Sequence, residues 1–410
     1  MSGQDIIVIG AGVVGMATAL TLADHGHRVT VLDAAAEPGR GTSFANGAQL
    51  SYAYTDALAS PGVRGQLPRL LLGLDPAFRL TPRIDPDFVR WGLAFLRNSS
   101  ADAFLRNTLA GLELAFESRD ALHALTERHA LRFEHTRPGK LHLYRTAQSF
   151  AAAQALAARK STAAPVVQRV LSADEAVSVE PMLAAVRGKI VGALHSPDEE
   201  AGDPYLFCLA ARDALVQAGH RILADIPVER IEAGRSPHAI TRSGAACRGD
   251  HIILCAGPDS PRLARALGVM LPIQPVKGYS ITAPFGSAAP SASITDVSNR
   301  VVFCRLGERM RIAGLAELCN RDRRVDPARL ATLVASARDA LPQAANYDDI
   351  ESSWAGLRPM TPDSLPVLRP IAPGVIANTG HGALGWTYAA GSAQRVAKLV
   401  EMSHGAVRND

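Results

Sequence analysis

Three glycines near the start of the 410-residue chain, Gly10, Gly12 and Gly15, have the spacing of a turn that binds a pyrophosphate. They follow an apolar run at residues 6–9, which suits a strand buried on both faces, and they precede a helical stretch at residues 14–23. Gly10 permits the tight turn, Gly12 lets the backbone approach the phosphates, and Gly15 lets the helix lie close to the sheet. The phosphates would then meet the N-terminus of the helix, where N–H groups and the helix dipole favour negative charge.

An acidic residue completes this motif. Asp33 follows a second apolar strand at residues 29–32, where its carboxylate can accept hydrogen bonds from an adenosine ribose. Because strand, glycine turn, helix and acid occur in register, the sequence predicts a dinucleotide site, which also includes Val13 and Val14.

The composition favours a globular protein large enough for two domains. Of the 410 residues, 47% are hydrophobic and 20% are charged, and the net charge is only +4. The 43 basic residues are scattered among 39 acidic ones, so no basic tail or patch indicates nucleic acid as a partner. No apolar run has the length of a membrane-spanning helix, which argues against an integral membrane protein and leaves contact with a membrane surface open.

The five cysteines, at positions 208, 247, 255, 304 and 319, stand singly, without C-x-x-C or zinc-binding spacing. We expect buried thiols in a reducing compartment, and therefore a cytoplasmic protein without a metal site. Peripheral contact with the inner face of the cell membrane stays open.

Apolar strands that are each followed by a glycine-bearing turn and a helix begin at residues 6, 251 and 375. They are too far apart for consecutive nucleotide-binding units, so we expect one sheet built from discontinuous segments. A discontinuous nucleotide domain interleaved with a second domain suits a flavoprotein, in which extended FAD is buried at the domain interface. The cofactor contacts predicted on the later strands and turns are Val228, Ala256 and Gly257.

The other segments predict an α+β domain of antiparallel sheet. Helical spacing dominates residues 85–129, strands are expected at residues 278–282, 301–305 and 309–313, and a helix at residues 326–341. The predicted fold is therefore α/β, with a discontinuous, Rossmann-like FAD-binding domain of the GR2 type and a substrate-binding domain. The predicted bounds are residues 1–85, 165–270 and 350–410 for the first domain, and residues 86–164 and 271–349 for the second.

An irregular loop at residues 39–51, GRGTSFANGAQLS, follows the dinucleotide motif where a simple nicotinamide dehydrogenase would continue with regular strands and helices. Small hydroxyl and amide side chains in such a run can wrap a phosphate or a ring edge; an ordinary surface loop is the alternative. The loop residues that we assign to the cofactor are Thr42, Ser43, Asn46, Gly47, Gln49 and Leu50.

Four motifs occur along the chain: GTSFANGAQLS at residues 41–51, VKGYS at 276–280, WAGLRPMTPD at 354–363 and NTGHGALGWT at 378–387. In this order they resemble the D-amino acid dehydrogenase small-subunit group, within the larger family that includes D-amino acid oxidase and glycine oxidase. The resemblance covers nearly the whole chain. It implies a two-domain FAD enzyme that oxidises the Cα–N bond of a D-amino or D-imino acid and passes electrons to a quinone or another respiratory acceptor.

The chain departs from this group in the loop. It has Asn46-Gly47-Ala48-Gln49, where the group more often has the alanine and glycine reversed, and residues 51–54 replace a glycine- and proline-bearing continuation. The substrate therefore stays open between a D-alanine-like acid, D-proline and D-hydroxyproline. An oxidase that uses O2, an FAD-containing subunit of a larger complex and a nicotinamide enzyme remain alternatives, although isolated cysteines offer no iron–sulfur ligands for an electron relay.

An α-carboxylate bound beside a flavin needs a fixed cation, and the planar fork of arginine can bind both oxygens while staying charged. Arg305, which ends the strand at residues 301–305, and Arg358 are the candidates, with structural ion pairs as the alternative. By comparison with glycine oxidase-like relatives, the resemblance implies that Arg305 holds the carboxylate, Tyr279 adds its hydroxyl and Arg358 lies beside them. Tyr54 is a further candidate for the side-chain pocket.

The glycine-rich turn at residues 380–385 precedes a helix at residues 388–402, whose N-terminus could stabilise the negative charge of reduced flavin. His381 could assist there or serve only the geometry of the turn. In relatives with a covalent flavin the tether is a histidine or cysteine beside the ring, and residues 42–47 contain neither, so we expect non-covalent FAD. The predicted contacts are Gly380, His381, Gly382, Leu384, Gly385, Trp386 and Thr387.

An apolar tract at residues 61–78 contains five leucines together with Arg64 and Arg69. It could lie in a membrane interface and bring the flavin near a quinone pool, or it could form a core helix.

Overall fold

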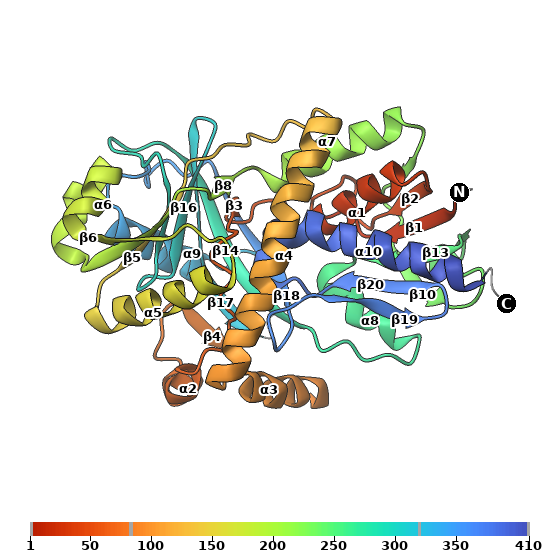
Figure 1. Cartoon of the computed structure of the whole chain (residues 1–410), viewed down its shortest axis with the longest axis horizontal. Coiled ribbons are helices and arrows are strands. Elements are labelled where there is room, and N and C mark those ends of the chain that lie inside the picture. The colour runs from red at the N-terminus through yellow and green to blue at the C-terminus, as the bar shows by residue number, and fades with distance from the viewer. Residues whose placement is uncertain (1–2, 82–84, 319–320, 408–410) are drawn as a thin grey trace.

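The computed structural model describes residues 3–81, 85–318 and 321–407, which form two large sheets surrounded by helices (Figure 1). Within these residues, the first sheet has six strands, in the spatial order β19 (Val367–Ala372), β20 (Val375–Thr379), β13 (His251–Leu254), β1 (Asp5–Ile9), β2 (Arg28–Leu32) and β9 (Arg221–Leu223). All neighbouring pairs are parallel except β19 with β20. The strands near residues 6, 251 and 375 are thus adjacent, which confirms one sheet of discontinuous segments.

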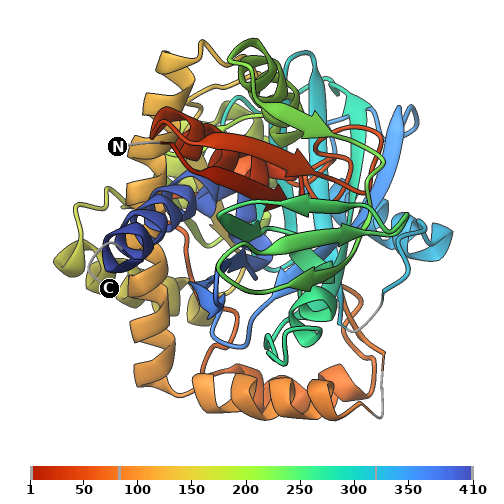
Figure 2. The ribbon, with the colours of Figure 1, turned by 90° about the vertical axis from the view of Figure 1, so that its right-hand side faces the viewer.

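Different elements cover the two faces of this sheet. On one face, α1 (Val13–Asp24) packs with α7 (Pro204–Gln217), α10 (Gly385–Val407) and the long α4 (Ala101–Arg128) around Ile6 and Val8. Figure 2 shows α10 crossing α4 beside the sheet. On the other face, Ile7 and Ile9 pack against α8 (Ser260–Arg265) and a small antiparallel sheet of β10 (Val228–Glu232), β11 (His238–Thr241) and β12 (Ala246–Arg248). The alternation of side chains along β1 explains this sandwich.

The second large sheet contains nine strands among the described residues, and most of its pairs are antiparallel. Its spatial order is β18 (Ser352–Met360), β14 (Gln274–Pro284), β17 (Arg309–Leu318), β16 (Val301–Leu306), β15 (Ser293–Asp296), β5 (Lys140–Tyr144), β7 (Gly192–Ser196) and β6 (Arg169–Ser172), with β4 (Phe78–Leu80) paired to β17. The β15–β5 and β17–β4 pairs are parallel.

Helices cover this second sheet as well. The core on one face includes side chains of α9 (Pro327–Ala340), α6 (Ala173–Val179) and the 3-10 helix η1 (Pro181–Lys189). Two short strands, β3 (Gln49–Leu50) and β8 (Glu200–Ala201), pair with each other. The other elements are α2 (Val63–Leu71), α3 (Pro86–Asn98), α5 (Ala147–Ala163) and the 3-10 helices η2 (Gly257–Asp259) and η3 (Gly382–Leu384).

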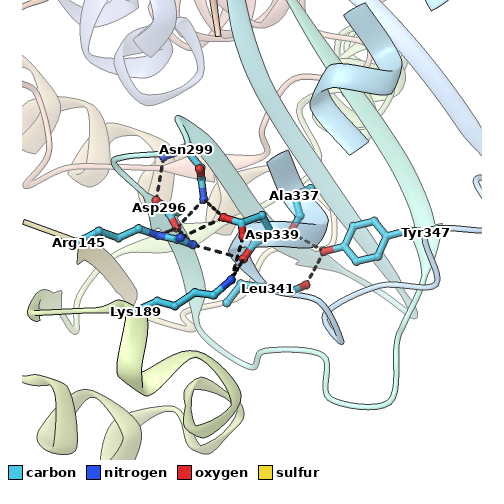
Figure 3. A network of polar contacts seen from close by, with 8 residues as sticks. All are labelled: Arg145, Lys189, Asp296, Asn299, Ala337, Asp339, Leu341 and Tyr347. Atoms are coloured by element: carbon cyan, nitrogen blue, oxygen red, sulfur yellow. Dashed lines mark hydrogen bonds and ion pairs between the residues drawn. The ribbon is translucent and has the colours of Figure 1, made fainter. Parts of the chain in front are cut away.

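A polar network holds the end of β15 against α9 (Figure 3). Buried Asp296 accepts a hydrogen bond of 2.9 Å from Arg145, which also pairs with Asp339 of α9 at 3.0 Å. Lys189 of η1 donates to the same Asp339 at 2.8 Å, and Asn299 bridges both acids. The turn between β15 and β16 is thereby fixed, and with it the strands that carry Thr295 and Val302.

Strand pairing changes the predicted domain bounds. β6 and β7 pair with each other and then with β5, and β18 pairs with β14, so all three belong to the larger sheet. The predicted bounds had placed residues 165–270 and 350–410 wholly with the FAD-binding domain. The division into two domains remains a proposal, and we propose that residues 165–199 and 351–361 belong to the domain of the larger sheet.

Close packing around the first glycine turn explains why position 15 requires glycine. A Cβ at Gly15 would lie 1.8 Å from the carbonyl oxygen of Gly10. At Gly10, φ is +108°, and a Cβ there would lie 2.5 Å from the carbonyl oxygen of Cys255 on the chain following β13. The turn, the helix and two strands therefore meet in van der Waals contact through backbone atoms.

We expect Gly15→Ala to lower the free energy of unfolding by at least ~2 kcal/mol, the range of overpacked cores. The matched control is Gly65→Ala on exposed α2, where a Cβ meets nothing within 4 Å. That change should cause no loss, because alanine favours a helix over glycine by about 0.5–1 kcal/mol. Urea unfolding of both variants checks this, and a Gly15→Ala protein as stable as the wild type would contradict the packing argument.

Candidate active site

A cavity of about 390 Å³ lies between the two large sheets. Its walls come from the start of α1, the loop at residues 42–51, the turn at residues 380–386, and the facing strands β14, β15, β16, β17 and β18. This volume falls within the range of small-molecule and cofactor pockets. The cavity thus joins the predicted cofactor elements to the predicted substrate-binding sheet.

The predicted cofactor residues fall into two groups. Those that line the cavity are Val13, Val14, Thr42, Ser43, Asn46, Gly47, Gln49, Gly257, Gly380, His381, Gly382, Leu384, Gly385 and Trp386. Those that lie outside its lining are Gly10, Gly12, Gly15, Asp33, Leu50, Val228, Ala256 and Thr387. The second group includes the glycine turn and Asp33, which are expected at the adenosine end of an extended dinucleotide.

The glycine turn is held in place by Asp33. One of its carboxylate oxygens accepts from the N–H of Ala11 at 2.5 Å and the other from the N–H of Ala35 at 2.7 Å. Burial raises the pKa of Asp33. The N-terminus of α1 carries no acidic side chain in its first turn, and the N–H of Val13 donates to the Ser43 hydroxyl at 3.1 Å. The N-terminus of α1, with glycine at its N-cap and no acidic side chain to neutralise it, suits an anionic group, so the residues present fit the pyrophosphate of FAD.

His381 is neutral in this structure, because burial lowers its pKa to about 3. Its Nε2 lies 3.0 Å from the Ser392 hydroxyl, which itself donates to the carbonyl oxygen of Ala389. The single hydroxyl proton is thus engaged, and Nε2–H of His381 must donate. A neutral, hydrogen-bonded ring supplies no positive charge to a flavin, so its contacts favour the role in turn geometry. Any charge stabilisation here comes from the N-terminus of α10, which begins at the cavity wall.

Of the two arginines predicted in the site, Arg358 is the one that lines the cavity. It projects from β18 so that its guanidinium lies over Gly278 of β14, where a Cβ would be 2.3 Å from it. Nη1 donates to the carbonyl oxygen of Leu315 at 3.1 Å, and no carboxylate among the described residues pairs with it. Burial lowers the pKa of Arg358 to about 10. A partly buried, unpaired guanidinium that faces a cavity is suited to bind a carboxylate.

The two tyrosines predicted in the site both border the cavity. The Tyr279 side chain packs in the core of the larger sheet, and its hydroxyl donates to Glu317 at 3.3 Å, so it is directed to a protein carboxylate. Tyr54 stacks on His142, with ring centroids 4.0 Å apart, at the end of the cavity near β5. Tyr54 therefore belongs to a different part of the cavity from Arg358.

Arg305 lies outside the cavity, which corrects the expectation that it holds a carboxylate there. Side chains alternate along β16, so Val302 faces the cavity and Arg305 points to the opposite face. The Arg305 guanidinium is exposed and lies over the Phe285 ring, 4.3 Å from its centroid.

Lys140 was missed by the sequence analysis. It is 3% exposed on β5, lines the cavity, and donates to the Ser51 hydroxyl at 2.7 Å. The available signal was the strand sequence KLHLY, in which Lys140 and His142 share one face of an otherwise apolar strand.

A separate cluster of His123, His135 and Glu200 has donor atoms close enough to hold a metal ion. Glu200 accepts from both histidines, at 2.7 and 2.8 Å, and from the Tyr52 hydroxyl at 3.0 Å. Arg137 also pairs with Glu200 at 3.2 Å, so protein groups already balance this buried carboxylate.

Comparisons with known proteins identify the family of the chain. The family model described as DAO, FAD dependent oxidoreductase, matches residues 5–399. D-amino acid dehydrogenase 2 of Pseudomonas aeruginosa is 40% identical over 406 residues, covering 97% of this chain and 95% of the relative. D-amino acid dehydrogenase 2 of Ralstonia nicotianae is 39% identical over 411 residues, which cover 97% of this chain and 96% of the relative.

Solved structures show the same fold. Glycine oxidase from Geobacillus kaustophilus matches with a TM-score of 0.77 and 21% identity over 98% of this chain and 95% of that chain. L-proline dehydrogenase from P. horikoshii matches with a TM-score of 0.75 and 16% identity over 98% of this chain and 94% of that chain. The α/β fold with an FAD-binding unit and a sheet-based second unit is therefore confirmed, and the chain belongs to the DAO family of FAD-dependent oxidoreductases.

Proposed function

We propose that this protein oxidises the Cα–N bond of a D-amino acid, with hydride transfer to FAD, and delivers the electrons to a quinone. The observation that supports it most directly is Arg358, a partly buried cation without a carboxylate partner among the described residues, in the cavity between the cofactor elements and the larger sheet. The names of the relatives, D-amino acid dehydrogenases, support the substrate class and the use of an acceptor other than O2. D-proline and D-hydroxyproline remain within the proposal.

Bound FAD would supply the hydride acceptor, and the chain supplies binding and orientation. Arg358 would hold the α-carboxylate through both oxygens, which fixes Cα relative to the cofactor. The amine must be neutral for its lone pair to assist hydride departure. The N-terminus of α10, at the cavity wall, would favour the negative charge that accumulates on reduction.

Arg358→Ala should lower kcat/KM, raising the corresponding activation free energy by about 3–5 kcal/mol, which is the range for removing one partner of a buried charge pair. The FAD content should stay unchanged. Arg358→Lys should recover part of this loss, because it keeps a charge and loses the bidentate fork. Arg305→Ala is the matched control, since Arg305 is exposed on the far face of β16. Steady-state kinetics with D-alanine and an artificial electron dye check this. A folded, FAD-loaded Arg358→Ala protein with near wild-type kcat/KM would remove the proposed carboxylate anchor.

The flavin should be released by acid, because we propose non-covalent binding. The described cysteine nearest the cofactor elements, Cys255, lines the cavity beside the glycine turn, and burial raises the pKa of its thiol to about 12. Cys208, Cys247 and Cys304 are free thiols as well, and Cys319 lies outside the described residues. Acid precipitation followed by absorbance of the supernatant checks this; yellow colour that stays with the pellet would refute it.

The proposed quinone acceptor is supported by exposed apolar side chains of neighbouring segments, which we call the apolar face: Leu71 at the end of α2, Leu72 and Leu74 after it, and Val89 and Leu93 of α3. Their exposures run from 52% to 72%. No residue of α2 is buried, so the alternative of a core helix is wrong for this segment. Figure 1 shows α2 beside α3 at the lower edge of the molecule, and Arg64 donates to Ser99 at the end of α3 at 2.8 Å.

This apolar face is connected to the cavity through the chain. Leu58 and Ala77, which flank the α2 segment on either side, both line the cavity. Exposed Arg64 and Arg69 precede these leucines on α2 and would favour anionic lipid headgroups. None of the described helices has the length and hydrophobicity needed to cross a membrane. We therefore propose peripheral contact, in which the lipid surface covers the apolar face and a quinone approaches the cavity from there.

Changing Leu71, Leu72 and Leu74 together to Ser should abolish co-sedimentation with vesicles that contain anionic lipid. The midpoint of thermal unfolding should stay nearly constant, because exposed side chains contribute within about 0.5 kcal/mol. The matched control is the triple change of Val170, Val179 and Val191 to Ser, at residues 41–49% exposed elsewhere on the molecule. Wild-type protein that stays in the supernatant, or equal loss in the control, would contradict membrane contact through this face.

A further inference from the structure

Beside the end of the cavity near β5, some buried polar atoms have no partner among the described residues. These are the Thr295 hydroxyl, at the cavity wall, and both ring nitrogens of His142, which stacks on Tyr54 and lies outside the cavity lining. Thr295 is 8% exposed and lines the cavity, and it stands directly opposite His142 in the β15–β5 pair. Buried polar groups in native proteins are almost always hydrogen-bonded, so such a group requires an explanation.

Lys140 adds a positive charge to this group. Its Nζ is hydrogen-bonded to the Ser51 hydroxyl at 2.7 Å and lies 5.3 Å from the centre of the Tyr54 ring. No carboxylate of the described residues lies within ion-pair distance of it. Its neighbour Lys160, by contrast, is paired with Asp56 and donates to the Ala53 carbonyl oxygen at 3.0 Å. Burial lowers the pKa of Lys140 to about 8.

Of the three cationic side chains that line the cavity, Arg300 is paired with Asp75 at 3.0 Å, which leaves Arg358 and Lys140, from different strands, without a carboxylate partner among the described residues. The guanidinium of Arg358 lies over β14 and β17, and Lys140 comes from β5, which is separated from β17 by β16 and β15. Three strand spacings amount to ~14 Å between the axes of β17 and β5, and the pairing register places Lys140 in the row of Thr282, four residues (~13 Å) along β14 from Gly278. The long side chain of Lys140 shortens this distance, and a substrate held by Arg358 would have to extend its side chain along the sheet to approach it.

We propose that Lys140 and Thr295 form a subsite for the side chain of the amino acid, which ends in a hydrogen-bond-accepting oxygen. Lys140 Nζ and the Thr295 hydroxyl are both donors, so they match a distal carboxylate or amide carbonyl, as in D-glutamate or D-glutamine. An apolar side chain would leave the Thr295 hydroxyl, and the N–H groups of Lys140 that do not bond Ser51, unsatisfied in a buried site, which costs binding. This inference rests on the proposed function, and it narrows the substrate class to D-amino acids with polar, oxygen-bearing side chains.

The test uses the FAD-loaded protein and unreactive ligands, so that it does not depend on turnover. Glutarate and valerate have the same chain length, and only glutarate carries the distal carboxylate. Titration followed by the change in flavin absorbance should show glutarate binding about tenfold to a hundredfold more tightly than valerate, since hydrogen bonds to charged groups have that effect. Lys140→Met should remove the preference and Lys140→Arg should restore part of it.

Two further variants keep the test decisive. Thr295→Val removes one donor at similar volume and should lower the preference severalfold, even if Lys140→Met does not fold. Lys160→Met is the matched control, because Lys160 is equally buried and does not line the cavity. Equal binding of glutarate and valerate by the wild type, a preference that survives both Lys140→Met and Thr295→Val, or its loss in Lys160→Met would overturn the subsite.

Measurement of turnover is the second part of the test. The ratio of kcat/KM for D-glutamate to that for D-norvaline should fall in Lys140→Met in parallel with the ligand preference. If no D-amino acid is oxidised but the preference for glutarate follows Lys140, the proposed function fails and the anion subsite stands. If D-amino acids are oxidised and the ratio does not depend on Lys140, the subsite fails and the proposed function stands.

Discussion

Backbone contact at the first glycine turn is the constraint on which the rest of the structure depends. The carbonyl oxygen of Gly10 occupies the space that a side chain at Gly15 would need, so α1 is held against the end of β1. Gly10 in turn contacts the backbone that follows β13, and β20 is the next strand along. This contact sets the position of the N-terminus of α1 relative to the turn at residues 380–386, and thus the shape of the cofactor side of the cavity.

The local parts of the fold could be predicted from the sequence because their signals are local. Asp203 and Pro204 begin α7 as N-cap and first residue, and Ser172 and Glu175 form a capping box at α6. The glycine motif lies directly between an apolar strand and a helix, so all three could be predicted together. Pairing between distant segments was different: β6 and β7 join β5 through contacts that no short pattern encodes, so the predicted domain bounds differ there.

The candidate site shows the same division. Arg358 could be found because it stands in a motif with a family resemblance, and the structure brings it to the cavity. The sequence could not predict which face of its strand Arg305 lies on. The strand VVFCRL has apolar residues on both faces, so no alternation of polar and apolar residues marks the buried face. Lys140 was overlooked for the opposite reason: a lysine in a strand is usually at its solvent face, and only the pairing of β5 with β15 shows that this one is enclosed.

The order of the strands also decides when the protein can fold during synthesis. β1 emerges from the ribosome first, but its neighbour β13 follows some 240 residues later, and β20 and α10, which complete that layer, come at the C-terminal end. Contacts of such high sequence separation form slowly, and apolar β1 must stay protected until they do. A chain that has been synthesised only as far as residue 374 therefore lacks part of the flavin site and leaves the sheet open beside β13.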